Sequence, residues 1–132
     1  MLVMNPEILI IRTLKEAEKE IAKINVNPIG VKIMALKAIQ VSVKFKSVDS
    51  KTANIVKQEM LSRGGDVAVS RDVGSFEAEK TDMIIIGTLA QYVRLVRKLK
   101  HQTAFDCKKI AKEIQSLLLE EFGIDIDKTY VW

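Results

Sequence analysis

The chain has 132 residues, of which 48% are hydrophobic and 29% charged, and its formal net charge is +4. This size predicts a single domain over residues 1–132 that can bury a core without disulfides or metal. Cys107 and His101 are the only cysteine and the only histidine, which excludes an internal disulfide and argues against a zinc site. The chain start does not resemble a signal peptide, and no apolar run reaches the roughly 20 residues of a membrane helix, so we expect a cytoplasmic protein without a membrane partner.

The first third of the chain predicts a strand, a helix and further extended chain. Glu7–Arg12 is an apolar, β-branched run and predicts a buried strand. Thr13, with a glutamate three residues later, has the form of a capping box, so we expect a helix that starts there and ends before Pro28. Residues 31–46 alternate between apolar and polar side chains at both ends, which predicts strand there. Met34–Ile39 between them could be continuing strand, a bend or a helical turn, and we favour strand with a break near Lys37.

The middle of the chain is a clear α/β segment. A helix is expected to be capped by Asp49 or Ser50 and to be stopped by Gly64 and Gly65. It is followed in order by a strand, a polar surface loop and a buried strand, over Asp66–Val69, Ser70–Lys80 and Thr81–Ile86.

The last third predicts two helices and a final extended segment. Thr88, directly after Gly87, is a suitable N-cap for a helix whose end near Lys100 is rich in cations. Asp106 is expected to cap the last helix, and Ile124–Trp132 to be extended. The predicted fold class is α/β, in the mixed α+β sense, with about five strands in a mixed sheet and about four packed helices.

Gly87 and Thr88 form the first candidate site. A strand that leads into a helix leaves free backbone N–H groups at the helix start, and these favour a small anion. Arg63 and the loop at Ser70 and Arg71 would lie nearby if the two strands were parallel neighbours. The alternative is that Gly-Thr is only an ordinary helix start.

A polar helix face forms the second candidate site. Its amide and cationic side chains could pair with a phosphate or with an acidic protein surface, although such faces are more often simply solvated. The two candidate sites together comprise Asn54, Lys57, Gln58, Arg63, Gly87, Thr88 and Gln91.

A basic patch lies at the end of the third predicted helix and includes Arg94, Arg97 and Lys98. Nucleic-acid binding would require aromatic residues among these cations, and the nearest, Tyr92, is on the apolar face, so we do not expect a nucleic-acid partner. Cys107, near a helix start, could have a lowered pKa, but it lacks a recognisable base. We therefore predict no catalytic residues, no metal and no cofactor.

Four segments taken together resemble a known family. They are Gly30-Val-Lys-Ile-Met-Ala-Leu-Lys-Ala38, Ala53-Asn-Ile-Val-Lys-Gln-Glu-Met-Leu-Ser-Arg-Gly-Gly-Asp66, Lys80-Thr-Asp-Met-Ile-Ile-Ile-Gly-Thr-Leu-Ala-Gln91, and Lys98-Leu-Lys-His-Gln102 with Ile110-Ala-Lys-Glu-Ile114. In this order they resemble the N-terminal extension domain that precedes the barrel in one group of dihydropteroate synthases and related pterin-binding proteins. The second and third segments are the specific ones.

The chain departs from that family where its catalysis resides. The family's barrel begins with a pattern like Asn-x-Thr-Pro-Asp-Ser-Phe, which this sequence lacks, and the chain is about half the length that a (β/α)₈ barrel needs. The resemblance therefore implies a non-catalytic binding or assembly module linked to folate, pterin or one-carbon metabolism. Its implied partner is a separately encoded pterin-binding enzyme, or a second copy in a homodimer. The alternatives are a protein that binds a small anionic ligand or, third, a basic nucleic-acid binder.

Overall fold

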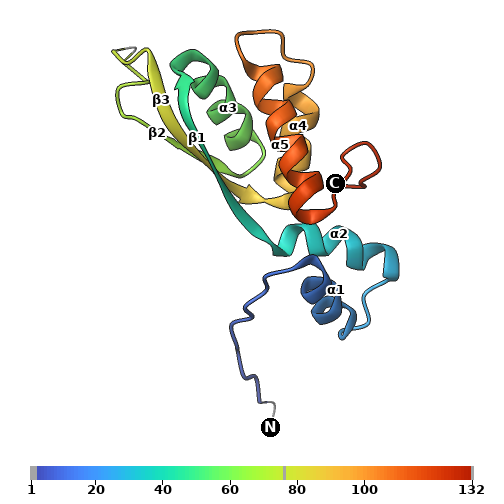
Figure 1. Ribbon diagram of the computed structural model, residues 1–132. Coiled ribbons are helices and arrows are strands. Elements are labelled where there is room, and N and C mark those ends of the chain that lie inside the picture. The colour runs from blue at the N-terminus through green and yellow to red at the C-terminus, as the bar shows by residue number, and fades with distance from the viewer. Residues whose placement is uncertain (1–2, 76, 132) are drawn as a thin grey trace.

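The computed structural model describes residues 3–75 and 77–131 and has a single-domain, mixed α/β fold (Figure 1). Within those residues there are five helices and a three-stranded antiparallel sheet. In chain order the elements are α1 (Leu14–Ala22), α2 (Pro28–Ala38), β1 (Gln40–Asp49), α3 (Ser50–Ser62), β2 (Asp66–Val69), β3 (Lys80–Thr88), α4 (Leu89–Leu99) and α5 (Cys107–Phe122).

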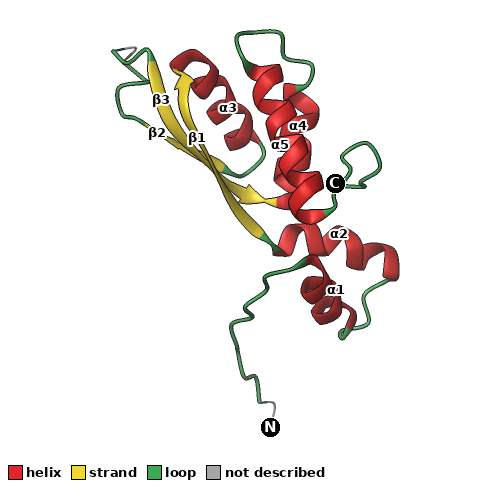
Figure 2. Ribbon diagram, in the orientation of Figure 1, coloured by secondary structure: helices red, strands yellow, loops and turns green. Residues whose placement is uncertain are grey.

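The sheet has the order β1-β3-β2, with β3 in the centre and antiparallel to both neighbours. Side chains alternate along β3, so that Met83 and Ile85 are buried whereas Ile84 and Ile86 are exposed. Helices α3 and α4 cover the buried face, and α5 packs against α4 (Figure 2). The sheet therefore has one face in the core and one face open.

Several local predictions are confirmed. The side chains of Thr13, Asp49 and Thr88 accept the N-cap hydrogen bonds of α1, α3 and α4. Asp106 is at the N-cap position of α5, although its side chain makes no capping hydrogen bond. The predicted strands at 66–69 and 81–86 correspond to β2 and β3.

The prediction for residues 31–39 is wrong, because this region is helix α2. Asn27 is its N-cap, with Oδ1 accepting a hydrogen bond from the Ile29 N–H at 3.0 Å, and Pro28 is at the first helical position. Proline is well suited there because the N–H that it lacks would have no helical partner. Only the second half of the predicted strand exists, as β1.

The other two predicted strands are also absent from the sheet. Glu7–Arg12 pairs with no strand and is largely exposed. Residues 124–131, in the predicted final extended segment, form turns and loop. Phe76 of the predicted loop and Trp132 of the predicted final segment lie outside the described residues. The sheet of the described chain thus has three strands, not about five, and it is antiparallel rather than mixed. Five helices replace the four that were predicted.

None of the helices among the described residues is both long and apolar enough to cross a membrane.

Candidate functional site

Four of the seven predicted site residues meet where α3 ends, β3 ends and α4 begins. We call this contact, made by Arg63, Gly65, Gly87, Thr88 and Gln91, the α3–α4 joint. The side chain of Gln91 connects it: Nε2 donates to the Arg63 carbonyl at 3.1 Å, and Oε1 accepts from the Thr88 N–H at 2.8 Å. Thr88 Oγ1 accepts from the Gln91 N–H at 3.2 Å, which completes a capping box.

Two glycines allow the elements of this joint to approach closely. A Cβ at Gly65 would lie 2.7 Å from the carbonyl oxygen of Ile86, and one at Gly87 would lie 2.4 Å from Cε of Met60. Neither distance is compatible with a side chain at van der Waals contact. The glycines at this end of α3 and β3 therefore serve packing.

The helix start at Thr88 offers few free donors to an anion. The N–H groups of Thr88 and Gln91 are bonded within the capping box, and the Leu89 N–H donates to the carbonyl of Ile39 at 3.1 Å. An anion at this end of α4 would have to displace protein acceptors. The geometry favours the ordinary helix start over the anion cradle.

The loop at Ser70 and Arg71 does not join this site. Because β2 and β3 are antiparallel, with Asp66 opposite Ile86 and Val69 opposite Met83, the loop lies at the far end of β2 from Gly87. The parallel arrangement that would have placed it beside Thr88 is not present.

The remaining three predicted residues lie along α3. Lys57 is held by two hydrogen bonds, from Nζ to Asp66 Oδ1 at 3.0 Å and to the Val67 carbonyl at 2.7 Å. The Lys57 bond is the main cause of a lowered pKa at the exposed Asp66 carboxyl. Asn54 is half-buried and Gln58 is exposed, so Gln58 is the most accessible of the three.

An open cationic hollow of about 500 Å³ lies beside the joint, between the end of α3 and the outer side of α4. Two of its cations are bound within the protein: Arg63 pairs with Glu59 at 2.8 Å, and Arg97 donates to the carbonyls of Ile126 and Thr129. The hollow is lined by Ser62, Arg63, Arg94, Arg97 and Lys98.

The side chains of Arg94 and Lys98 make no hydrogen bond or ion pair with any other residue that the structure describes. They are four residues apart on α4 and therefore lie on the same face of the helix. Sequence reasoning identified these cations as a basic patch, but it did not connect them with Arg63 and Ser62. The link depends on the packing of α3 beside α4.

Cys107 does not have the lowered pKa that its position at a helix start suggested. It is buried, and burial, with further contributions from the Asp106 and Glu59 carboxylates, raises the pKa of its thiol. A raised pKa keeps the sulfur protonated and poorly nucleophilic near neutral pH. The residues that the structure describes contain no group of three or more His, Cys, Asp or Glu that could hold a metal ion.

No family model and no solved structure matches this chain. Two curated proteins do. The chain is 32% identical over 90 residues to a probable bifunctional folylpolyglutamate synthase/dihydropteroate synthase of Halobacterium salinarum, and 32% identical over 108 residues to the protein of that name in Haloferax volcanii.

These alignments cover 68% and 81% of this chain. They cover only 11% and 12% of the two proteins, so the chain spans about a tenth of the length of these relatives. The chain is thus distantly related to bifunctional enzymes of the folate pathway, and the folate-related part of the sequence-based resemblance is supported at this level.

Proposed function

We propose that this chain is a non-catalytic binding or assembly module of folate or pterin metabolism, related to the N-terminal extension of dihydropteroate synthases. The observation that carries the proposal is the similarity to bifunctional enzymes that include a dihydropteroate synthase, over most of this chain but only a small part of theirs. Because the match covers only about a tenth of such an enzyme, we assign this chain a binding role, with a pterin-binding enzyme as its partner.

The internal bonds of the candidate residues support a binding role rather than a chemical one. The Lys57 bond joins α3 to β2, the Gln91 bond joins α4 to the end of α3, and Arg63 pairs with Glu59 within α3. The Cys107 thiol is buried and protonated. What remains accessible on this side is a polar surface that includes Gln58, Arg94 and Lys98.

Titration calorimetry with the dihydropteroate synthase of the same organism tests the proposal. We expect saturable binding that weakens when Gln58 is replaced by Glu, whereas Lys112→Glu on the exposed side of α5 should leave the affinity unchanged. Absence of heat at concentrations up to high micromolar would overturn the proposal. If Gln58→Glu altered the circular dichroism spectrum, Gln58→Ala would be measured in its place.

A second candidate function is the binding of a small anionic ligand in the cationic hollow. The observation that favours it is the pair Arg94 and Lys98, which have no carboxylate partner among the described residues. Guanidinium and ammonium groups without such partners can bind phosphate or carboxylate groups.

A thermal-shift titration with pterins, p-aminobenzoate, folates and nucleotides tests this second function. A ligand that binds only the native state raises the melting temperature with its concentration. We expect such a shift in the wild type and its loss in Arg94→Gln. A flat response to all these ligands would remove this candidate and leave the protein partner as the one proposed function.

A further inference from the structure

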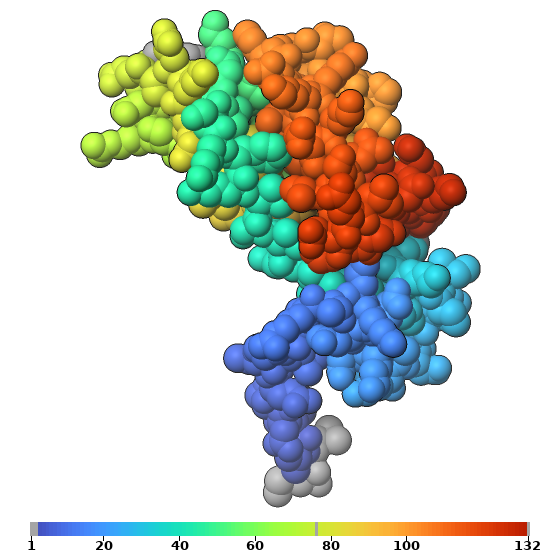
Figure 3. Space-filling model, in the orientation of Figure 1, coloured from blue at the N-terminus to red at the C-terminus, as the bar shows by residue number. Residues whose placement is uncertain are grey.

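The N-terminal arm, residues 3–12, is a largely apolar segment that is exposed except at Ile11, which is partly buried against the core. Met4, Ile8 and Ile10 are 87%, 89% and 71% exposed. Within the described chain, no backbone group of residues 3–11 makes a hydrogen bond, and the Arg12 N–H bonds to Glu16. Figure 3 shows the arm projecting from the body of the molecule.

Such a segment is unfavourable in water and is suited to burial. The sequence of Glu7–Arg12 predicts a buried strand, but in the structure this stretch is a loop and is largely exposed. Exposed runs of large apolar side chains are rare on isolated proteins and mark interaction sites. The described residues leave the arm exposed, so a surface that covers it lies outside the described part of this chain.

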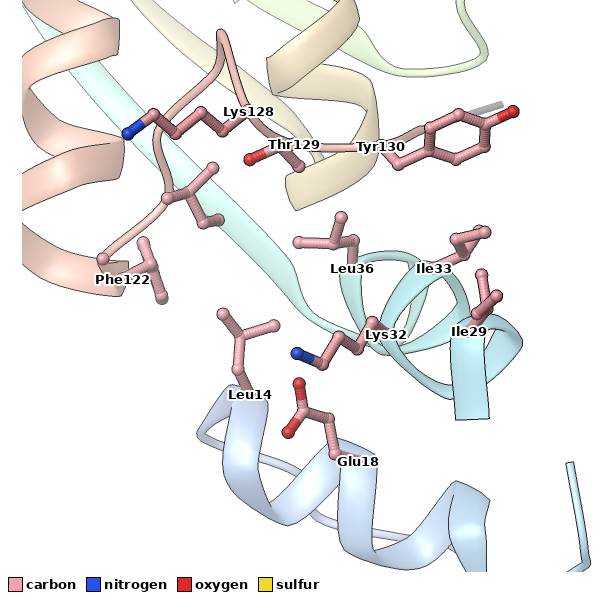
Figure 4. A pocket seen from close by; sticks show the side chains of 12 residues that line it. Leu14, Glu18, Ile29, Lys32, Ile33, Leu36, Phe122, Lys128, Thr129 and Tyr130 are labelled. Atoms are coloured by element: carbon pink, nitrogen blue, oxygen red, sulfur yellow. The ribbon is translucent and has the colours of Figure 1, made fainter. Parts of the chain in front are cut away.

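The same chain carries an apolar groove beside helix α2. This α2 groove, of about 420 Å³, is formed by α1, α2 and the segment after α5 (Figure 4). Glu18 and Lys32 lie among its otherwise largely apolar side chains. A second hollow of about 590 Å³ shares Ile29 and Ile33 with it and extends it over the start of α2. The apolar lining of the α2 groove comprises Leu14, Ile29, Ile33, Leu36, Phe122 and Ile124.

Helix α2 carries exposed apolar side chains on its outer side. Val31, Ala35 and Leu36 are buried, while Ile29 is 73% exposed and Met34 is also exposed, beside the exposed Lys32 and Lys37. Large apolar side chains that gather on a surface mark interaction sites. The arm and the outer side of α2 are thus two surfaces with apolar side chains that the described residues leave exposed.

The arm cannot readily fill the groove of its own copy. It joins α1 at Thr13, next to Leu14 in the groove wall, so the chain would have to reverse between Glu7 and Arg12. That stretch has no Gly, Pro, Asn or Asp, which are the residues that form tight turns, and its isoleucines are stiff at χ1 and favour extended chain. The arm instead leads away from α5 and the C-terminal segment (Figure 1).

We propose that two copies of this chain form a dimer by exchanging arms, each arm lying in the α2 groove of the other copy. A two-fold axis makes the exchange reciprocal, because each copy then donates one arm and receives one. Ten extended residues reach about 33 Å. An arm of this length and of roughly 10 Å width, the width of a packed layer, covers an equal area of groove. Counted over two arms and two grooves, the buried area is about 1,300 Å², which is within the range of stable interfaces.

The dimer interface is distinct from the α3 surface assigned to an enzyme partner, and the inference does not depend on the folate assignment. The chain is tested alone, by light scattering after gel filtration from low to high micromolar concentration. We expect a dimer for the wild type. The double variant Ile8→Asp, Ile10→Asp and the groove variant Ile29→Asp should each be monomeric with an unchanged far-ultraviolet circular dichroism spectrum, since these side chains make few contacts within the monomer.

Two further samples make the test specific. Leu119→Asp, which places the same charge at a 56% exposed leucine on α5, should remain dimeric. An equimolar mixture of the arm variant and the groove variant keeps one intact arm and one intact groove, so it should partly restore the dimer. A wild type that is monomeric at every concentration, or an arm variant that dimerises like the wild type, would overturn the proposal.

Discussion

Gly65 shows how a single residue controls the α3–α4 joint. A Cβ there would be 2.7 Å from the carbonyl oxygen of Ile86, and that oxygen belongs to the central strand and cannot move independently. We expect Gly65→Ala to lower the free energy of unfolding by about 1–3 kcal/mol, as overpacking does.

Urea unfolding followed by circular dichroism measures this loss. Gly74→Ala is the matched control, because a Cβ at Gly74 has no neighbour within 4 Å. Its stability should remain within about 0.5 kcal/mol of the wild type. Equal stability of the two variants would contradict the close approach between α3 and β3.

Tyr92 connects α4 to the sheet from inside the core. Its hydroxyl is within hydrogen-bond distance of two carbonyls, those of Val41 at 2.8 Å in β1 and Ile85 at 2.7 Å in β3. Burial raises the pKa of this phenol well above its ordinary value of 10.0. We expect Tyr92→Phe to cost about 1–2 kcal/mol near neutral pH, because it leaves buried carbonyls without their donor.

The same pKa shift predicts how stability changes in alkali. The unfolded chain loses the Tyr92 proton near pH 10, whereas the folded chain keeps it, so the stabilisation is complete below pH 10 and declines above it. The stability difference between the wild type and Tyr92→Phe should therefore shrink as the pH rises above 10. A difference that is constant from pH 7 to about pH 11 would show that the phenol is not desolvated.

At the scale of elements, the segment after α5 is joined to α4 by hydrogen bonds from Arg97, besides the Lys100–Asp127 ion pair at 3.4 Å and the burial of Ile124 and Ile126. Arg97 of α4 donates to the carbonyls of Ile126 and Thr129. We expect Arg97→Gln to lower stability by about 2 kcal/mol, since hydrogen bonds with a charged donor are the stronger kind. Amide hydrogen exchange in residues 124–131 should accelerate at the same time.

Lys98→Gln is the control for Arg97, because Lys98 is exposed on the same helix and makes no polar contact within the described chain. It should change neither stability nor exchange measurably. If both variants behaved alike, the C-terminal segment would be held by packing of Ile124 and Ile126 instead.

The elements that sequence reasoning found have a clear local signal. β3 was found as an unbroken apolar run, although only one of its faces is buried, and α3 and α4 have capping residues at their starts. Helix α2 was missed because its apolar residues are spread round the helix and show no helical period, and Asn27-Pro28 was interpreted as a stop rather than as a cap. The signal for a start, Asn followed by Pro, was present.

The candidate site was predicted in part for the same physical reasons. Gly87, Thr88 and Gln91 lie together because a strand end and a helix start are local features. Arg63 was expected near them only if β2 and β3 were parallel, but these strands are antiparallel, and Arg63 is reached by a contact from Gln91 across 28 residues. The relation of Arg63 to Arg94 and Lys98 depends on helix packing, which has no local signal. Strand direction likewise decides that Arg71 is remote from Gly87.

At the scale of the whole molecule, the apolar surfaces and the polar surfaces lie at different places. The arm and the outer side of α2 belong to other elements than Gln58, Arg94 and Lys98, which lie on α3 and α4. We therefore propose that a second copy and an enzyme partner bind to different surfaces of the molecule.

Sedimentation velocity tests whether this chain binds an enzyme partner. The samples are the chain, its proposed partner and their equimolar mixture. We expect the mixture to contain a species that sediments faster than either protein alone, and we expect Gln58→Glu to reduce its amount. The control variant Lys112→Glu should form that species as the wild type does. A mixture whose profile equals the sum of the two separate profiles would contradict the claim that this chain acts by binding another protein.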